Sequence, residues 1–559
     1  MSLADDLRKT VRGRVDDSAA ARDAASRDAS LFRIEPAVVV TPEDAADVEA
    51  VVRLAAEKKA VGERVSVTAR SAGTDMSGGP LNDSIILDMT GMNRLIELGA
   101  DYAVAEPGMF FRDFDKETGK KDLELPSYTA SREINTIGGM TANDSGGEKN
   151  LKYGKTARYV EELDVVLADG AVHTLKKLEG ESLAKKLAET GFEGDLYRAV
   201  AKLVSENKEA IASAAPKVEK NSSGYALWDI GDPSPSLGTG GKPSLNLARL
   251  MVGAQGTLGI ITRLRLRLVH PEPFSSMLVL FVKDLHDLGI LVPEVLKHHP
   301  DSFESYDDRV VALVARYFPE FAAQMKSGLI GVAFAFLPEV WMALSGGIPK
   351  IVLLVEFRGK TQAEALLKAE SLAKGMHVLG VHEKMHIAKD APAARKYWVM
   401  RRETFNLLRK KVRGLKTSPF IDDFVVPPAS LPEFLPKLDA ILSGYRFPYA
   451  VSGHVGDGNF HIFPLLDPAD PGTRPLIGTL SKEVYDLVLS YHGSITGEHN
   501  DGLIRTPYVE QMFGKKMYAL FEEMKKIFDP FGIFNPGKKV GMDASDAFAH
   551  LDLPEQNGA

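Results

Sequence analysis

Cysteine is absent from the 559 residues of this chain. The absence excludes disulfides, thiolate metal ligands, iron–sulfur clusters held by the usual cysteine sets, and cysteine nucleophiles. It also fits a reducing compartment. We therefore expect a cytoplasmic protein, with peripheral contact to the inner face of a membrane as an open alternative.

An excess of positive charge is absent as well. The formal net charge is −8, whereas a nucleic-acid binder would need a basic face, so we expect no nucleic-acid partner. The N-terminal stretch MSLADDLRKTVRGRVDD is charged and contains no apolar run. This composition argues against a secretory signal.

Long apolar runs are scarce, with one exception. Gly328–Pro349 carries Glu339 as its only charge and is just long enough to span a membrane. Pro338, Glu339 and the pair Gly346-Gly347 interrupt it. We prefer a buried helix–turn pair as the interpretation, and a patch that docks on a membrane or a partner protein is the alternative.

The length of the chain exceeds what one core supports, so two or three domains are expected. Near the N-terminus, Ala37–Val40 and Val65–Thr68 are typical of buried strands, and Ala45–Lys59 between them is typical of an amphipathic helix. Together they predict a β-α-β unit. From Phe274 onward the pattern changes to one that predicts a separate α+β domain with an antiparallel sheet.

Three glycine-rich runs lie beside predicted strands, at Ala69–Gly79, Thr136–Gly147 and Gly253–Ile261. Small residues let the backbone approach a ligand closely, and successive N–H groups can cradle a phosphate. No GxGxxG follows the first strand, which argues against a Rossmann site. The three runs together predict a long diphosphate ligand held between two lobes.

A short hairpin is predicted at Tyr449–Pro464, with Gly456–Asn459 as a tight turn. Folding at that centre makes His454 and His461 a cross-strand pair, with Cβ atoms roughly 5 Å apart. With Glu498 downstream they form a three-ligand set for zinc or manganese that leaves one position open for substrate. Ordinary hairpin histidines are the alternative, and the three residues together favour the metal.

These motifs resemble a known family. The glycine runs resemble the flavin-binding domain of the vanillyl-alcohol oxidase and p-cresol methylhydroxylase superfamily. The segments GHVGDGNFH, TGEH and FDPFGIFNPGK resemble its D-lactate and D-2-hydroxyglutarate dehydrogenase branch.

The resemblance covers residues 32–540 and implies an α+β protein. It divides the chain into an N-terminal helical segment (1–31), a two-lobed p-cresol methylhydroxylase-type FAD-binding domain (32–271), an antiparallel-sheet cap domain for substrate and metal (272–514), and a C-terminal segment returning to the flavin (515–559).

The resemblance implies bound FAD. Members with covalent flavin carry a histidine in the first glycine run, and Ala69–Gly73 has none, so we expect noncovalent FAD. Residues Arg70–Gly79 would hold the pyrophosphate. The full set of residues expected at the cofactor is Arg70, Ser71, Gly73, Thr74, Asp75, Ser77, Gly78, Pro126, Thr136, Gly138, Gly139, Ala142, Asn143, Gly146, Gly147, Tyr153, Gly154, Ile260, Ile261, Asn535 and Lys538.

The resemblance also implies the catalytic groups. His454, His461 and Glu498 would bind the divalent metal, and His499 would be the catalytic base. Arg401, or Arg402 as second choice, would grip the substrate carboxylate, because a planar guanidinium suits a carboxylate bidentately. From spacing alone, the two adjacent arginines would instead indicate a solvated helix face.

Three positions depart from the family pattern. Asn500 follows the GEH segment, where relatives often have glycine. Phe463 stands where relatives have asparagine, and Ile421 where some members have a lysine. The last two weaken the case for a dicarboxylate substrate.

The activity implied is oxidation of a D-lactate-like D-2-hydroxy acid to the 2-oxo acid, by hydride transfer to flavin N5 with help from the metal. D-2-hydroxyglutarate is the alternative substrate. Electrons would pass to a quinone, a cytochrome or a partner redox protein, and an oligomer is left open. Two other classes stay open: a metallohydrolase using the same ligand set, and a non-catalytic flavoprotein subunit that docks on a membrane complex through Gly328–Pro349.

Overall fold

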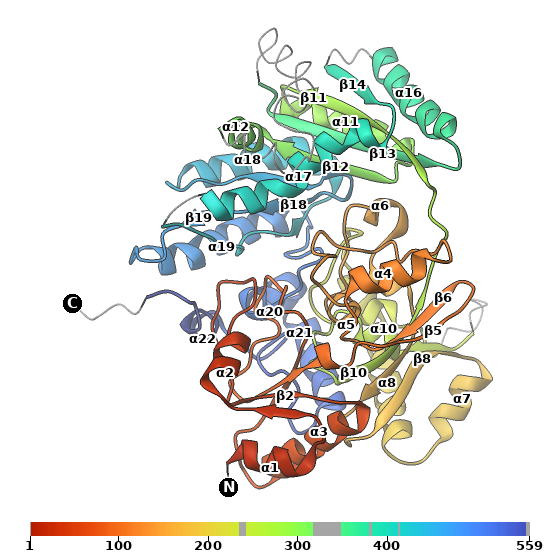
Figure 1. Cartoon of the computed structure of the whole chain (residues 1–559), viewed down its shortest axis with the longest axis vertical. Helices are drawn as coiled ribbons and strands as arrows, with labels where there is room; N and C mark the ends of the chain where they lie inside the picture. The colour runs from red at the N-terminus through yellow and green to blue at the C-terminus, as the bar shows by residue number, and fades with distance from the viewer. Residues whose placement is uncertain (1, 234–241, 317–347, 380–382, 412–413, 555–559) are drawn as a thin grey trace.

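The computed structural model describes all residues except 1, 234–241, 317–347, 380–382, 412–413 and 555–559. The N-terminal half lies at one end of the molecule and the cap at the other, and the C-terminal helices run back among the N-terminal elements (Figure 1). Gly328–Pro349 falls almost wholly outside the described residues, so both interpretations of that segment remain predictions.

The first lobe is a four-stranded sheet in the order β1-β2-β4-β3, in which β2, β4 and β3 run parallel. Helix α3 (Ala45–Ala60) begins after Asp44, whose carboxylate accepts a hydrogen bond from the N–H of Ala46. Its apolar side chains pack on those of the strands, as the β-α-β prediction requires. The strands are β1 (Arg14–Asp16), β2 (Val38–Thr41), β3 (Val67–Arg70) and β4 (Ile85–Asp88).

The N-terminal segment is helical only in part. Helices α1 (Leu3–Thr10) and α2 (Ala19–Ala25) flank β1, which pairs antiparallel with β2. The segment therefore belongs to the first lobe and does not form a separate element.

The second lobe is a six-stranded antiparallel sheet in the order β5-β6-β10-β7-β8-β9. Alternate residues of β10 are buried, as expected of a strand with one face on a core. That core includes side chains of α8 (Phe192–Glu206) and α21 (Val509–Phe528). The strands are β5 (Leu95–Leu98), β6 (Tyr102–Ala105), β7 (Val160–Val166), β8 (Val172–Glu179), β9 (Ser244–Asn246) and β10 (Ile260–Arg267).

The cap contains a seven-stranded sheet in the order β14-β11-β13-β12-β17-β18-β16. In β11, Leu278 and Leu280 face one core and Met277 and Val279 face another, so the sheet is buried on both sides. The strands are β11 (Phe274–Val282), β12 (Ser302–Asp307), β13 (Ile351–Gly359), β14 (Lys384–Ala388), β16 (Phe424–Val425), β17 (Val451–His454) and β18 (Asn459–Ile462). The helices against them include α11 (Leu288–Lys297), α12 (Asp308–Arg316), α16 (Gln362–Val378), α17 (Ala391–Lys411) and α18 (Leu431–Ser443).

The hairpin forms, but its register differs from the prediction by two residues. β17 and β18 pair with His454 opposite Asn459 and Ser452 opposite His461. The reason is a 3₁₀ turn at Val455–Asp457, closed by Gly458 with a positive φ of 68°. The two histidines are thus diagonal neighbours on one face and not a directly opposed pair.

The C-terminal segment returns to the first lobe. Helix α21 breaks at Gly514, whose φ is 78°, and its second part ends at Phe528. Beyond it the N–H of Val67 donates to the carbonyl of Ile533, and the N–H of Asn535 donates to the carbonyl of Val67. The segment FDPFGIFNPGK is thereby placed against β3, beside the first glycine-rich run.

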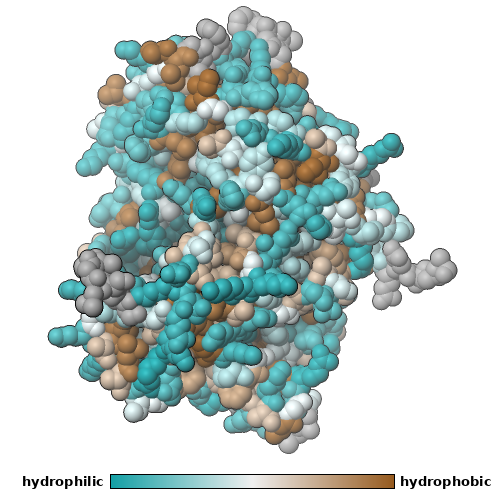
Figure 2. Space-filling view, turned by 180° about the vertical axis from the view of Figure 1, so that it is seen from behind, coloured by the Kyte–Doolittle hydropathy of each residue, from teal (hydrophilic) through white to brown (hydrophobic). Residues whose placement is uncertain are grey.

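Among the described residues, no helix combines the length and the apolar character needed to cross a bilayer. On the face seen in Figure 2, hydrophilic side chains predominate and apolar ones are interspersed among them. Nothing on that face singles out an extended apolar surface.

Candidate active site

A cavity lies where the three glycine-rich runs meet. The first run follows β3, the second forms α5 (Ile137–Asn143) and the third leads into β10. Eleven of the residues predicted at the cofactor line this cavity: Ser71, Gly73, Thr74, Asp75, Thr136, Gly138, Gly139, Ala142, Asn143, Gly146 and Ile261.

The other predicted cofactor residues are not part of the lining: Arg70, Ser77, Gly78, Pro126, Gly147, Tyr153, Gly154, Ile260, Asn535 and Lys538. Several of them support it. Arg70 donates to the carbonyls of Ala25 and Arg27, and Asn535 donates to the carbonyls of Gly79 and Gln255. Their side chains therefore shape the loops, and direct cofactor contact by them stays a prediction.

Sequence reasoning missed part of the lining. Gln255 lies within the third run, and its amide contacts Ser77 and Asn143 while its oxygen accepts from the N–H of Gly502. The run itself was the signal for this residue. Residues Thr129–Ser131 and Asn135 also line the cavity, but they stand in a stretch without a glycine motif, so nothing in the sequence marked them.

The lining fits FAD. A Cβ on Gly138 would lie 2.4 Å from the Cβ of Pro107, so only glycine allows this approach. At Gly256, with a φ of 68°, the nearest atom to such a Cβ would be 4.0 Å away, so its backbone stays open to the cavity. Walls of this kind suit a flat ring and a diphosphate approached by backbone N–H groups.

The three predicted metal ligands converge. The Nε2 atoms of His454 and His461 lie 3.3 and 3.4 Å from Oε1 of Glu498, and all three side chains are buried. Two ligand atoms bound tetrahedrally at about 2.0–2.1 Å from one ion lie about 3.3–3.4 Å apart. The two distances to Glu498 therefore match the spacing of ligands around a small divalent cation.

The protonation of the two imidazoles differs. Burial lowers the pKa of His461 to about 4, so its ring is neutral at pH 7 and can act as a ligand. Burial also lowers the pKa of His454, but Glu304 outweighs that effect and the net pKa is above the usual value. The Nδ1 of His454 donates to Oε1 of Glu304 over 2.5 Å, which leaves Nε2 facing His461 and Glu498.

Asp423 lies near the same point but is committed elsewhere. With His461, Glu498 and His499 it forms a cluster whose spacing would allow a metal. However, its carboxylate accepts from the N–H groups of Gly497, Glu498 and His499 and from the Thr496 hydroxyl. These bonds shape the TGEH loop, so we favour His454 over Asp423 as the third ligand.

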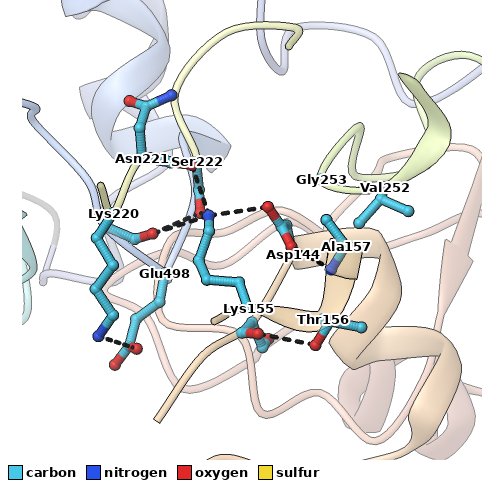
Figure 3. Close-up of polar contacts among 12 residues, drawn as sticks. Asp144, Lys155, Thr156, Ala157, Lys220, Asn221, Ser222, Val252, Gly253 and Glu498 are labelled. Carbon is cyan, nitrogen blue, oxygen red and sulfur yellow. Dashed lines mark hydrogen bonds and ion pairs between the residues drawn. The ribbon is translucent and has the colours of Figure 1, made fainter. Parts of the chain in front are cut away.

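Lys220 is a buried partner of Glu498 that the sequence did not reveal. Its Nζ donates to Oε2 of Glu498 over 2.7 Å and to Oδ1 of Asn459 over 2.9 Å. Figure 3 shows Lys220 directed at Glu498, while Lys155 ties the adjoining loop to Asp144. Burial raises the pKa of Glu498, but Lys220 and His454 outweigh it and keep the carboxylate ionised.

His499 sits beside this centre. Its ring stacks on that of His461 with centroids 5.0 Å apart, and its Nδ1 donates to Oδ2 of Asp422 over 2.7 Å. Burial lowers the pKa of His499, but Asp423 and Asp422 raise it to about 9. A divalent cation on Glu498 would oppose that proton, because Nε2 of His499 lies 4.0 Å from Oε1 of Glu498.

The two arginines of α17 have different partners. Arg402 forms a bidentate pair with Glu148, through Nε and Nη2. Among its contacts with described residues, Arg401 donates its Nε to Oε2 of Glu304 over 3.0 Å, and this bond leaves its terminal amino groups available. The geometry therefore supports Arg401 over Arg402 as the group that receives a carboxylate.

The three departures from the family pattern have different surroundings. Phe463 stacks on His461, with centroids 6.3 Å apart, and so lies at the site. Ile421 is fully buried and packs among the apolar side chains of the cap core. Asn500 adopts a φ of 69° and donates to the carbonyls of Asn143 and Gly253, so it joins the second and third glycine runs.

Family models match most of the chain. Residues 36–176 match a model described as FAD binding domain, and residues 272–539 match one described as FAD linked oxidases, C-terminal domain. The p-cresol methylhydroxylase structure with bound substrate is similar in fold, with a TM-score of 0.67 and 17% identity over 97% of this chain and 96% of that one. An alkyldihydroxyacetonephosphate synthase gives 0.64 and 16%, over 96% and 85%. The fold class predicted from the sequence is confirmed.

Several curated proteins are similar in sequence. D-2-hydroxyglutarate dehydrogenase of Pseudomonas putida is 28% identical over 547 residues, which is 94% of this chain and 50% of the relative. D-lactate dehydrogenase of Archaeoglobus fulgidus is 27% identical over 507 residues, 90% and 91% of the two chains. The chain thus spans about half the length of the dehydrogenases it matches first.

Proposed function

Because the chain belongs to the FAD-linked oxidases, carrying a FAD binding domain and their C-terminal domain, we propose that it oxidises a D-2-hydroxy acid to the 2-oxo acid. The observation that supports this most strongly is the convergence of His454, His461 and Glu498 beside His499, at the edge of the glycine-lined cavity.

Each group has a distinct role in the proposal. Arg401 holds the substrate carboxylate through its terminal amino groups, and His454, His461 and Glu498 hold a divalent cation. The charge of the cation opposes the proton that Asp423 and Asp422 favour on His499, so that the ring is neutral and takes the hydroxyl proton on Nε2, while Asp422 fixes the ring through Nδ1. When bound, FAD supplies an acceptor for hydride and the cation supplies a Lewis acid that lowers the pKa of the hydroxyl.

The side chain of the acid is proposed to be apolar or short, as in D-lactate. Phe463 stacks on His461 and presents an aromatic ring where a distal carboxylate would need a polar partner. D-2-hydroxyglutarate is the second candidate, because five of the relatives carry that dehydrogenase name.

The proposal also includes the electron acceptor and the location of the protein. A quinone, a cytochrome or a redox protein would reoxidise the flavin, in the cytoplasm or at the inner face of a membrane. A metallohydrolase is disfavoured because it would have no use for the glycine-lined cavity, which fits FAD, beside the ligand set. A non-catalytic subunit is disfavoured because the ligand set, His499 and Arg401 are all present in one arrangement.

The deciding experiment is a screen of D- and L-2-hydroxy acids against the purified flavoprotein without oxygen, followed by turnover with an artificial dye. Bleaching of the flavin absorbance by a D-acid, with release of the 2-oxo acid, is the expected result. Absence of bleaching by every acid at millimolar concentration would refute the proposal.

A further inference from the structure

Glu304 occupies a position that the proposed chemistry has not used. It lies on β12, whose antiparallel pairing with β17 joins Ser305 to Gly453 and Tyr306 to Ser452. Continuing that register by one residue places Glu304 opposite His454. Its side chain is 2% exposed, so the carboxylate is almost entirely removed from water.

The two oxygens of this carboxylate serve two different groups. Oε1 accepts from Nδ1 of His454 over 2.5 Å, and Oε2 accepts from Nε of Arg401 over 3.0 Å. One side chain therefore contacts both the imidazole proposed to bind the cation and the guanidinium proposed to bind the substrate carboxylate.

We propose that Glu304 is a positioning residue that fixes His454 as a metal ligand and Arg401 as a carboxylate clamp in one rigid unit. The inference rests on the proposed function. It adds a fourth protein group to the metal centre, outside the ligand set itself.

The physical reason lies in hydrogen-bond direction. An imidazole can bind a cation through Nε2 only when its proton sits on Nδ1, and a carboxylate acceptor at Nδ1 enforces that tautomer. The same carboxylate pairs with Nε of Arg401. This bond orients the planar guanidinium and leaves its two terminal amino groups for the substrate carboxylate.

A glutamine at this position cannot serve both partners. If the amide oxygen accepts from His454, the NH₂ group faces the Arg401 donor and that contact is lost. If the NH₂ group faces His454, Nδ1 must become an acceptor and the proton moves to Nε2, where it blocks the cation. Glu304→Gln should therefore weaken the metal site by roughly 10–100-fold, the usual effect of losing an outer-shell partner.

The chain offers a matched control. Glu356 lies on the neighbouring strand β13, is also buried, and accepts from Nε1 of Trp398 on α17 and from Arg358. Glu356→Gln removes a buried charge against the same helix but touches neither His454 nor Arg401. Glu304→Asp is a second variant, which keeps an ionised acceptor with a shorter reach.

The test measures zinc and manganese affinity of the FAD-loaded protein by competition with a chromophoric chelator. We expect Glu304→Gln to lose roughly 10–100-fold, Glu304→Asp to lie between it and the wild type, and Glu356→Gln to match the wild type. Circular dichroism and flavin absorbance report whether each variant is folded, and Glu304→Asp carries the test if Glu304→Gln does not fold.

Two failures can be told apart. If the wild type binds metal and Glu304→Gln binds it equally well, the inference is wrong and the proposed function stands. If Glu356→Gln loses as much affinity as Glu304→Gln, the effect is general destabilisation and the inference is also wrong. If the wild type binds no metal, the metal part of the proposed function fails together with the inference.

Discussion

Lys220 and Glu498 form a buried ion pair, with Nζ and Oε2 2.7 Å apart. The two residues are separated by 278 positions in the chain, so the pair fastens the loop around Lys220 to the TGEH segment. Removing one partner of a buried pair leaves an uncompensated charge and typically costs about 3–5 kcal/mol. Glu498 therefore has a neutralising partner even without a cation.

Metal removal should abolish activity without unfolding the protein. Dialysis against a chelator is expected to stop turnover while the protein stays folded and its flavin spectrum is unchanged, because Lys220 still neutralises Glu498. Added zinc or manganese should restore turnover of the wild type, whereas His454→Ala and Glu498→Ala should stay inactive with either metal. Glu498→Ala should also lose stability, because it leaves the buried charge of Lys220 without its partner. Full activity after chelation, with metal analysis confirming its removal, would exclude the metal role.

The flavin should be noncovalent. Among the described residues that line the cavity, the only imidazole belongs to His499 on the cap side, and the first glycine run has none. Acid precipitation is expected to release the yellow chromophore into the supernatant. Colour retained in the protein pellet would show a covalent link.

Arg401 and Arg402 should respond differently to the same change. Arg401→Lys loses the planar fork and is expected to lower kcat/KM. The loss should correspond to about 3 kcal/mol of transition-state stabilisation, as for one partner of a charged hydrogen-bonded pair. Arg402→Lys weakens the bidentate pair with Glu148 and should mainly lower stability. Steady-state kinetics and thermal melting of both variants separate the two effects, and near-normal kinetics of Arg401→Lys would transfer the role to Arg402.

Asp28 should make stability depend on pH. Burial, and next the charge of Asp75, raise the pKa of Asp28 to about 7. The Oδ1 of Asp28 accepts a hydrogen bond from the N–H of Ser30, and its Oδ2 has no hydrogen-bond partner among the described residues. The positive charge of Arg70 lowers the pKa in part, and Lys538 also interacts electrostatically with Asp28. The folded protein thus holds a proton that the unfolded chain releases near its ordinary pKa of 3.8.

The sign follows from this difference. Between pH 4 and 7 the folded state binds more protons, so the stabilising effect of the protonated carboxyl is lost as pH rises through this window. Asp28→Asn should match the wild type near pH 4 and exceed it by about 2–4 kcal/mol at pH 8. Urea unfolding at both pH values measures the free energy of unfolding, with Asp113→Asn at an exposed position as the control. The same stability difference between Asp28→Asn and the wild type at both pH values would contradict the prediction.

Much of the site was predictable because its motifs are local. The glycine runs, the hairpin and TGEH each concentrate small or polar residues within a few positions, and the fold brings them to one cavity. Glu304 and Lys220 gave no such signal. Glu304 stands in the strand SFESYD and meets His454 through the register of the sheet, 150 positions later. Lys220 meets Glu498 278 positions later. The hairpin register was missed because the loop is centred one residue earlier than predicted: Val455–Gly458 form it, and Asn459 already pairs with His454.

The proposed site should accept only one enantiomer of a 2-hydroxy acid. The flavin, the cation on His454 and His461, and Arg401 would fix the hydrogen, the hydroxyl and the carboxylate of the same α-carbon. Three fixed substituents allow only one enantiomer to direct its hydrogen at the flavin, and the relatives named D-lactate and D-2-hydroxyglutarate dehydrogenase favour the D form.

The fourth substituent would lie near Phe463, whose ring stacks on that of His461. We expect D-lactate or a longer aliphatic or aromatic D-2-hydroxy acid to reduce the flavin faster than D-2-hydroxyglutarate does, since the ring offers no partner for a second carboxylate. Ile421 carries no weight in this expectation, because it is buried in the cap core. Stopped-flow flavin reduction with each enantiomer measures both parts: faster reduction by an L-acid would overturn the mechanism, whereas a clear preference for D-2-hydroxyglutarate would overturn only the role of Phe463.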